Sequence, residues 1–315
     1  MKFYVGVTDG DWYRFLRRER PADINFWQPG GNSQFRALEK GAPFLFKLKA
    51  PAKAIGGLGF YSASAIQPLE TAWEYFRTGN GFSVFREFRT KIELYKRKNG
   101  WTNGPLVIGC IVLTDPIFFE DEDWIPAPSD WGASIVQGKT YDDAEPAGAS
   151  LWDAVRERLA KYRFYERGIE KPSELSLVAP TEGYRDTVAR VRLGQAAFRL
   201  LVTNAYDRAC AITGEHTLPV LEAAHIKPYA ESGPHRVSNG LLLRSDLHRL
   251  FDAGYLTVTP ELRVEVSGRI HEEFHNGKDY YALHGRRLST LPGRSEERPN
   301  RSFLEWHNEN VYRAG

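Results

Sequence analysis

The sequence predicts an α+β protein with two domains, and three observations lead to this fold class. About the first 140 residues contain several short apolar and aromatic runs typical of strands, with helix-like stretches between them. Residues 140–150 form a polar interruption that contains Pro and Gly. Beyond it, residues 218–254 show a strand, a turn, a second strand and a helix. A chain of 315 residues with 42% hydrophobic residues can bury two ordinary cores.

The N-terminal part is predicted to be rich in strands. Apolar runs that are short enough for strands lie at residues 1–7, 42–50, 54–61 and 105–113. Helices are expected at residues 11–18, where Asp9 can cap the first turn, and at residues 68–76. This mixture predicts a small β-barrel flanked by helices.

The interruption at residues 140–150 marks a domain boundary. A helix-like pattern follows at residues 151–165, and residues 171–181 have the Pro and Ser content of a loop. We therefore expect an N-terminal domain over residues 1–145, a helical linker over residues 146–184 and a C-terminal domain over residues 185–315.

The most informative stretch is LEAAHIKPYAESGPHRVSNGLLLRSDLHRLFD, at residues 221–252. His225 comes at the end of a short apolar run, Asn239 and the glycine after it form a turn dipeptide, and a second apolar run follows. His248 and Asp252 share one face of the predicted helix, which Gly254 ends. A two-stranded ribbon followed by a helix is implied.

Imidazole and carboxylate side chains on such a ribbon and helix can hold one divalent ion beside one free histidine. Phosphodiester hydrolysis needs both groups, because a neutral imidazole takes the proton from the attacking water while the metal stabilises charge on the phosphate and on the leaving oxygen. We assign the general base to His225.

Further segments carry a family resemblance. These are RLGQ at 192–195, FR at 198–199, CAITG at 210–214, LFDAG at 250–254 and FLEWH at 303–307. With the central stretch, they make residues 185–315 resemble the HNH domains of restriction endonucleases. The resemblance implies that His225 is the catalytic base, that Asn239 orients the loop or ligates metal, and that His248 binds metal.

One position departs from the HNH pattern. Many HNH sites have an Asp or His ligand directly before the base, where this chain has Ala224. We expect Asp252 to replace that ligand, with Glu222 and Asp246 as weaker candidates. Oxygen ligands suit Mg²⁺ or Mn²⁺, and imidazole ligands also admit Ni²⁺, Co²⁺ or Zn²⁺.

The cysteine content excludes one kind of zinc site, and the net charge does not by itself indicate a partner. The two cysteines, Cys110 and Cys210, cannot form the four-thiolate zinc site of some HNH domains, and they are typical of a reducing bacterial cytoplasm. The 42 Lys and Arg residues nearly balance 40 Asp and Glu residues, so net charge alone does not indicate nucleic-acid binding. Neither a signal peptide nor a membrane helix is predicted.

The N-terminal part resembles EVE domains, which belong to the PUA superfamily together with YTH and related modified-base readers. The resemblance covers residues 1–145 and depends on FWQP at 26–29, FLFKL at 44–48, IGGLGFYS at 55–62, AW at 72–73 and WG at 131–132. It implies a pocket for a flipped base, which needs aromatic faces for stacking and polar groups to read the base edge. The candidates are Trp27, Tyr61, Trp73, Trp131, Asn32 and Ser33.

A reader joined to a nuclease predicts a modification-dependent restriction endonuclease. It would flip 5-methylcytosine or 5-hydroxymethylcytosine out of double-stranded phage DNA and hydrolyse the nearby backbone, using a divalent metal. One HNH site cuts one strand, so we expect a homodimer for double-strand cleavage. Two alternatives stay open: an RNA-directed nuclease, and a nucleic-acid-binding protein whose nuclease has decayed, as Ala224 would allow.

Overall fold

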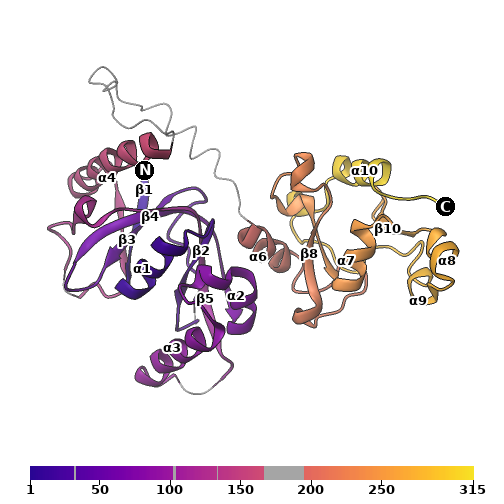
Figure 1. Cartoon of the computed structure of the whole chain (residues 1–315), viewed down its shortest axis with the longest axis horizontal. Helices are drawn as coiled ribbons and strands as arrows, with labels where there is room; N and C mark the ends of the chain where they lie inside the picture. The colour runs from indigo at the N-terminus through magenta and orange to yellow at the C-terminus, as the bar shows by residue number, and fades with distance from the viewer. Residues whose placement is uncertain (32, 102–103, 133, 167–194) are drawn as a thin grey trace. The chain divides into compact units, whose positions relative to one another are not determined.

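The computed structural model describes residues 1–31, 33–101, 104–132, 134–166 and 195–315. The chain divides into two compact units, Met1–Arg192 and Leu193–Gly315, which are shown in Figure 1. Much of the predicted linker, residues 167–184, lies outside the described residues.

The N-terminal unit combines one sheet of seven strands with helices, which confirms the predicted α+β class. The strand order is β2-β5-β4-β3-β1-β7, and β6 pairs with β4. The pairing of β1 with β3 is parallel, whereas the other pairings are antiparallel. In chain order the elements are β1 (Lys2–Thr8), α1 (Gly10–Glu19), β2 (Asp23–Gln28), β3 (Pro43–Leu48), β4 (Ala54–Pro68), α2 (Leu69–Phe76), α3 (Phe85–Lys98), β5 (Val107–Phe118), β6 (Ile125–Pro126), β7 (Gly138–Asp142) and α4 (Pro146–Glu166).

Both faces of this sheet are buried. Side chains alternate across a strand, so neighbouring residues of β3 enter different cores. Leu45 packs with Trp152 and other apolar side chains of α4. Phe44 and Phe46 pack on the other face with Trp12 and Leu16 of α1. Every residue of β3 is consequently buried, and α4 belongs to the core of the N-terminal unit.

The C-terminal unit contains the predicted ribbon and helix. β8 and β9 are antiparallel, with His225 opposite Gly240, and α7 follows β9 directly. The elements are α6 (Gln195–Ala205), β8 (Leu221–His225), β9 (Gly240–Arg244), α7 (Ser245–Asp252), β10 (Leu256–Val258), β11 (Val264–Val266), α8 (Arg269–Phe274), α9 (Lys278–Tyr281) and α10 (Arg301–Asn310). Short 3-10 helices in the two units lie at Arg77–Asn80, Asp121–Asp123, Leu218–Val220, Tyr229–Glu231, Val237–Asn239 and Ser295–Glu297.

Neither cysteine forms a disulfide. Cys110 and Cys210 are both free and buried, and Cys210 lies in the core of the C-terminal unit. Among the described helices, none has both the length and the apolar character that a membrane crossing requires.

Candidate active site

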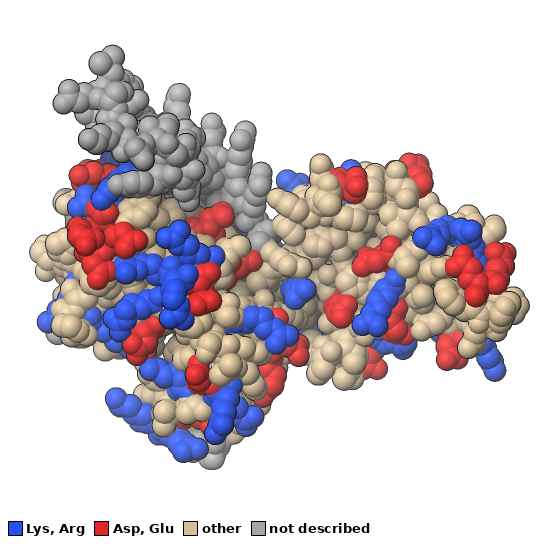
Figure 2. Space-filling model, in the orientation of Figure 1, with Lys and Arg blue, Asp and Glu red and all other residues tan. Residues whose placement is uncertain are grey.

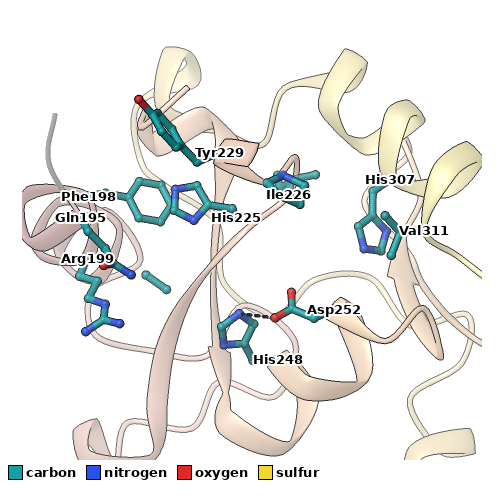
Figure 3. Close-up of a pocket in the computed structure, with 12 residues that line it drawn as sticks. Gln195, Phe198, Arg199, His225, Ile226, Tyr229, His248, Asp252, His307 and Val311 are labelled. Carbon is teal, nitrogen blue, oxygen red and sulfur yellow. Dashed lines mark ion pairs between the residues drawn. The ribbon is translucent and has the colours of Figure 1, made fainter. Parts of the chain in front are cut away.

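Three of the predicted site residues, His225, His248 and Asp252, lie at one cavity in the C-terminal unit. This cavity has a volume of about 280 Å³ and is lined mainly by residues of α6, β8, α7 and the segment that follows β8, with His307 of α10. His225 and His248, which are 23 positions apart in the sequence, both line it. Figure 3 shows the His225 ring against Phe198 and the His248 ring beside Asp252.

His225 is held by ring contacts at the end of β8. Its imidazole stacks on Phe198 of α6, with ring centroids 3.8 Å apart and planes inclined by 11°. Gly240, the partner of His225 in the ribbon, permits this stacking, because a Cβ there would lie 2.5 Å from Val202 Cγ2 and 3.0 Å from the Phe198 ring. On its other side, the Nε2 atom of His225 is 2.9 Å from Nδ1 of His235.

Asn239 is fully buried and connects two parts of the loop at residues 226–239. Its Oδ1 atom accepts a hydrogen bond from the Lys227 amide at 2.9 Å. Its Nδ2 atom donates to the carbonyl oxygens of Lys227 and Pro234, each at 2.9 Å. Of the two roles that the HNH resemblance implies, these contacts favour orientation of the loop over metal ligation.

His248 lies between two carboxylates. Its Nδ1 atom is 2.7 Å from Oε2 of Glu222, and its Nε2 atom is 3.3 Å from Oδ2 of Asp252. A histidine that donates its Nδ1 proton to a carboxylate keeps a free electron pair on Nε2, which is the usual arrangement around a metal-ligating imidazole. Glu222 is therefore placed to orient the ring, and Asp252 is placed beside the nitrogen that is free to bind metal.

The donor set fits a hydrated divalent ion. Two adjacent ligands at roughly 2.1 Å from one octahedral ion are about 3 Å apart, close to the 3.3 Å between the His248 and Asp252 donors. In the described part of the chain, no three His, Cys, Asp or Glu side chains are grouped to hold a metal. Mg²⁺ commonly binds through few protein ligands and completes its shell with waters and substrate phosphate, so two protein ligands suffice.

Asp246 is engaged elsewhere, and position 224 offers no ligand. Both oxygens of Asp246 accept hydrogen bonds from Arg244, at 3.0 and 2.6 Å. Ala224 is fully buried in the core of the unit, whereas the preceding Ala223 lines the cavity. Asp252 thus remains the carboxylate best placed to act with His248.

Sequence comparison agrees with this geometry. Residues 210–259 match the family model described as HNH endonuclease. The C-terminal unit contains an HNH endonuclease domain. The match includes the complete ribbon and α7, and therefore all of the residues from β8 and α7 that line the cavity.

Comparisons over longer parts of the chain are weaker. No curated protein matches the sequence. The ASCH structure from Zymomonas mobilis is 12% identical, with 48% of this chain and 94% of that chain covered and a TM-score of 0.29. The modification-dependent TagI restriction endonuclease is 14% identical, with 86% of this chain and 61% of that chain covered and a TM-score of 0.27. At these values neither structure supports a functional argument for this chain.

The pKa of His225 in the HNH domain is lowered to about 4, mainly by burial and further by the positive charges that His235, His248 and Arg199 can carry. An unperturbed histidine titrates near pH 6.5. His225 is consequently neutral over the whole physiological range and is able to accept a proton.

This shift predicts the acid side of the pH profile. Because protonation removes the base form only as the pH falls through about 4, single-turnover cleavage should not show a step near pH 6.5, where an ordinary histidine would titrate. The measurement is the cleavage rate between about pH 5 and 8 at several saturating Mn²⁺ concentrations. A fall in the cleavage rate with a midpoint near pH 6.5, at the same pH for every metal concentration, would contradict the shifted pKa of His225.

A second cavity, of about 520 Å³, lies in the N-terminal unit. Trp27 and Ser33 line it, as predicted for the base pocket, and Asn32 lies outside the described residues. The structure does not bring the other predicted aromatics to this cavity. Tyr61 is buried and its hydroxyl bonds Ser64, Trp73 packs against Phe85 and Phe88, and Trp131 lies under the ammonium group of Lys47.

Three polar residues that are not among the predicted pocket residues form part of this cavity wall. Asp9 accepts hydrogen bonds from Lys49 and from the Tyr95 hydroxyl, the latter at 3.1 Å, and all three residues line the cavity. Burial acts to raise the pKa of Asp9, but Lys49, Lys91 and Tyr95 together hold it below its ordinary value. Asp9 was predicted to cap α1, and it occupies the N-cap position, but its side chain makes no capping hydrogen bond.

Proposed function

We propose that the chain is a modification-dependent restriction endonuclease. It would flip and read 5-methylcytosine or 5-hydroxymethylcytosine in double-stranded DNA and hydrolyse the nearby backbone, in a bacterial cytoplasm exposed to phage DNA. The observation that carries the proposal is the occurrence, in one chain, of an HNH domain with His225 and His248 at one cavity and a separate unit with an aromatic, charged cavity.

In the proposed cleavage reaction, each side chain at the C-terminal cavity has one role. Neutral His225 accepts the proton of the attacking water, and Asn239 fixes the loop that follows His225. His248 and Asp252 would hold the divalent ion, which supplies charge stabilisation at the phosphate and at the leaving oxygen when bound. Arg199 lines the same cavity and offers a guanidinium group to the substrate phosphate.

In the proposed recognition step, the flipped cytosine base enters the N-terminal cavity. Its volume of about 520 Å³ is ample for a nucleobase. Trp27, Tyr95 and Trp101 line it and provide aromatic faces for stacking. The carboxylate of Asp9 can accept a hydrogen bond from the exocyclic amino group that distinguishes cytosine from thymine. The indole of Trp27 is fixed by a hydrogen bond from Nε1 to the carbonyl oxygen of Asn80, at 3.0 Å.

A basic helix borders this cavity and supplies a surface for the phosphate backbone. Helix α3, which contributes Tyr95 to the cavity wall, has the sequence FREFRTKIELYKRK, with six basic and two acidic residues. Figure 2 shows Lys and Arg side chains predominating over the lower end of the N-terminal unit, where Figure 1 places α3. Phosphate contacts of this kind position a protein on DNA without reading its sequence.

Cleavage of three matched supercoiled plasmids tests the proposal. They carry cytosine, 5-methylcytosine or 5-hydroxymethylcytosine throughout, and each is incubated with Mg²⁺ or Mn²⁺. We expect cutting of modified DNA only, with nicked product at low protein concentration and linear product as a homodimer forms on DNA. Equal cutting of all three plasmids would exclude the reading role, and nicking at every protein concentration would exclude the dimer. No cutting, together with no metal binding by calorimetry, would favour a decayed nuclease.

A further inference from the structure

A third histidine, His235, contacts the candidate base from outside the cavity. Its Nδ1 atom is 2.9 Å from Nε2 of His225. His225 and Tyr229 line the cavity, whereas His235 does not. The ring of His235 stacks on Tyr229, with centroids 4.7 Å apart and planes inclined by 12°. His235 therefore contacts the ring of the candidate base without lining the cavity, and it is none of the three landmark residues of the HNH pattern.

The hydrogen bond between the two rings determines which nitrogen of His225 can act as a base. A neutral imidazole carries one protonated nitrogen, which donates, and one bare nitrogen, which accepts. If Nε2 of His225 donates to Nδ1 of His235, the Nδ1 atom of His225 is bare and can take a proton. If the bond runs in the opposite direction, the electron pair of His225 on Nε2 is used by His235 and Nδ1 carries a proton. Only the first arrangement leaves a nitrogen free for catalysis.

The surrounding loop holds His235 in this place. Asn239 donates a hydrogen bond to the carbonyl oxygen of Pro234, the residue before His235. Gly233 allows the loop to turn tightly, because a Cβ there would lie 1.9 Å from the carbonyl oxygen of Lys227. Phe198 stacks on one face of the His225 ring, whereas His235 meets the ring at its Nε2 edge. The His225 ring is thus held by the stacked ring of Phe198 and by the His235 loop, which the hydrogen bonds of Asn239 close.

We propose that His235 is a positioning residue of the HNH site, which accepts the Nε2 proton of His225 and so presents the bare Nδ1 atom of His225 to the attacking water. This inference rests on the proposed role of His225 as the general base. It also gives Asn239 a specific task, since its bond to Pro234 places the residue that orients the base.

Two substitutions of His235 distinguish a role in orienting the His225 ring from a role in packing alone. His235→Asn removes the ring but keeps an amide oxygen near the position of Nδ1, where it can still accept the proton of His225. His235→Phe keeps a ring that can stack on Tyr229 but has no acceptor. We expect His235→Phe to lower the single-turnover cleavage rate by roughly 10- to 100-fold or more, and His235→Asn to retain most of the rate. DNA affinity and metal affinity should be unchanged in both variants. If packing alone mattered, His235→Phe would be the more active variant, and this order would overturn the proposal.

A spectroscopic measurement reports the tautomer without any cleavage. In protein labelled with ¹⁵N at histidine, the Nδ1 signal of His225, assigned by its loss in His225→Ala, should be that of an unprotonated nitrogen in the wild type and in His235→Asn. A protonated Nδ1 in the wild type would overturn the inference even if a variant failed to fold. Cleavage by His225→Ala is measured in parallel. Normal cutting by that variant would remove the base assignment itself, whereas an inactive His225→Ala with a fully active His235→Phe would remove the role of His235 alone.

Discussion

Replacing His225 with alanine should lower the rate of DNA cleavage by about 10²- to 10⁴-fold, the usual contribution of a general base. The candidate metal donors His248 and Asp252 lie on α7, whereas His225 lies on β8, so we expect DNA binding and metal binding to remain. Single-turnover cleavage of modified plasmid gives the rate, and gel mobility shift and calorimetry give the two affinities.

The control is His216→Ala, which removes an exposed histidine from the same unit. Because His225 stacks on Phe198, part of any loss could come from destabilisation, and thermal unfolding of both variants separates this effect. A folded His225→Ala protein that cuts at the wild-type rate would show that another group activates the water. His248 would then be the residue to reconsider, because it lines the same cavity.

The grouping of the candidate nuclease residues could be predicted because these residues belong to one continuous segment. The end of β8, the turn at Asn239 and the face of α7 are each set by local sequence, and the ribbon pairing then brings His225 and His248 to one cavity. The contact between His235 and His225 could not be predicted in this way. Its contact with His225 depends on the path of the loop between the strands, which Asn239 fixes through hydrogen bonds to the backbone.

The N-terminal cavity was only partly predictable because its wall is assembled from distant segments. Asp9 precedes α1, Lys49 follows β3 and Tyr95 lies on α3, so no local spacing connects them. Helix α3 itself was missed, although Phe85, Phe88, Ile92 and Tyr95 recur at helical spacing within its charged sequence. That periodicity is the signal that could have located Tyr95.

Aromatic content alone was a poor guide to the residues that line the N-terminal cavity. Tyr61, Trp73 and Trp131 resemble Trp27 in chemistry, but each packs on neighbours away from the cavity. Large aromatic side chains bury much apolar surface, so most of them serve a core wherever one is available. The feature that distinguishes Trp27 is its position at the end of β2, next to the residues 28–31 that line the same cavity.

Replacing Trp27 with alanine should weaken the selection of modified DNA. A base stacked on an aromatic side chain contributes about 1–3 kcal/mol, which corresponds to roughly 5- to 150-fold in affinity. The measurement is competition binding of duplexes with and without one 5-methylcytosine, using His225→Ala protein so that the DNA stays intact. We expect Trp27→Ala to lose affinity for the modified duplex and to keep its affinity for the unmodified one, because the basic residues of α3 are unaltered.

Trp73→Ala is the matched control for this experiment. Trp27 and Trp73 are both partly buried, and both pack against Phe88, but only Trp27 lines the cavity. The two truncations should therefore lower the thermal stability of the N-terminal unit by similar amounts, whereas only Trp27→Ala should change the preference for the modified duplex. An equal loss of preference in both variants would attribute the effect to packing around Phe88. If Trp27→Ala keeps the preference for the modified duplex, the flipped cytosine does not stack on Trp27.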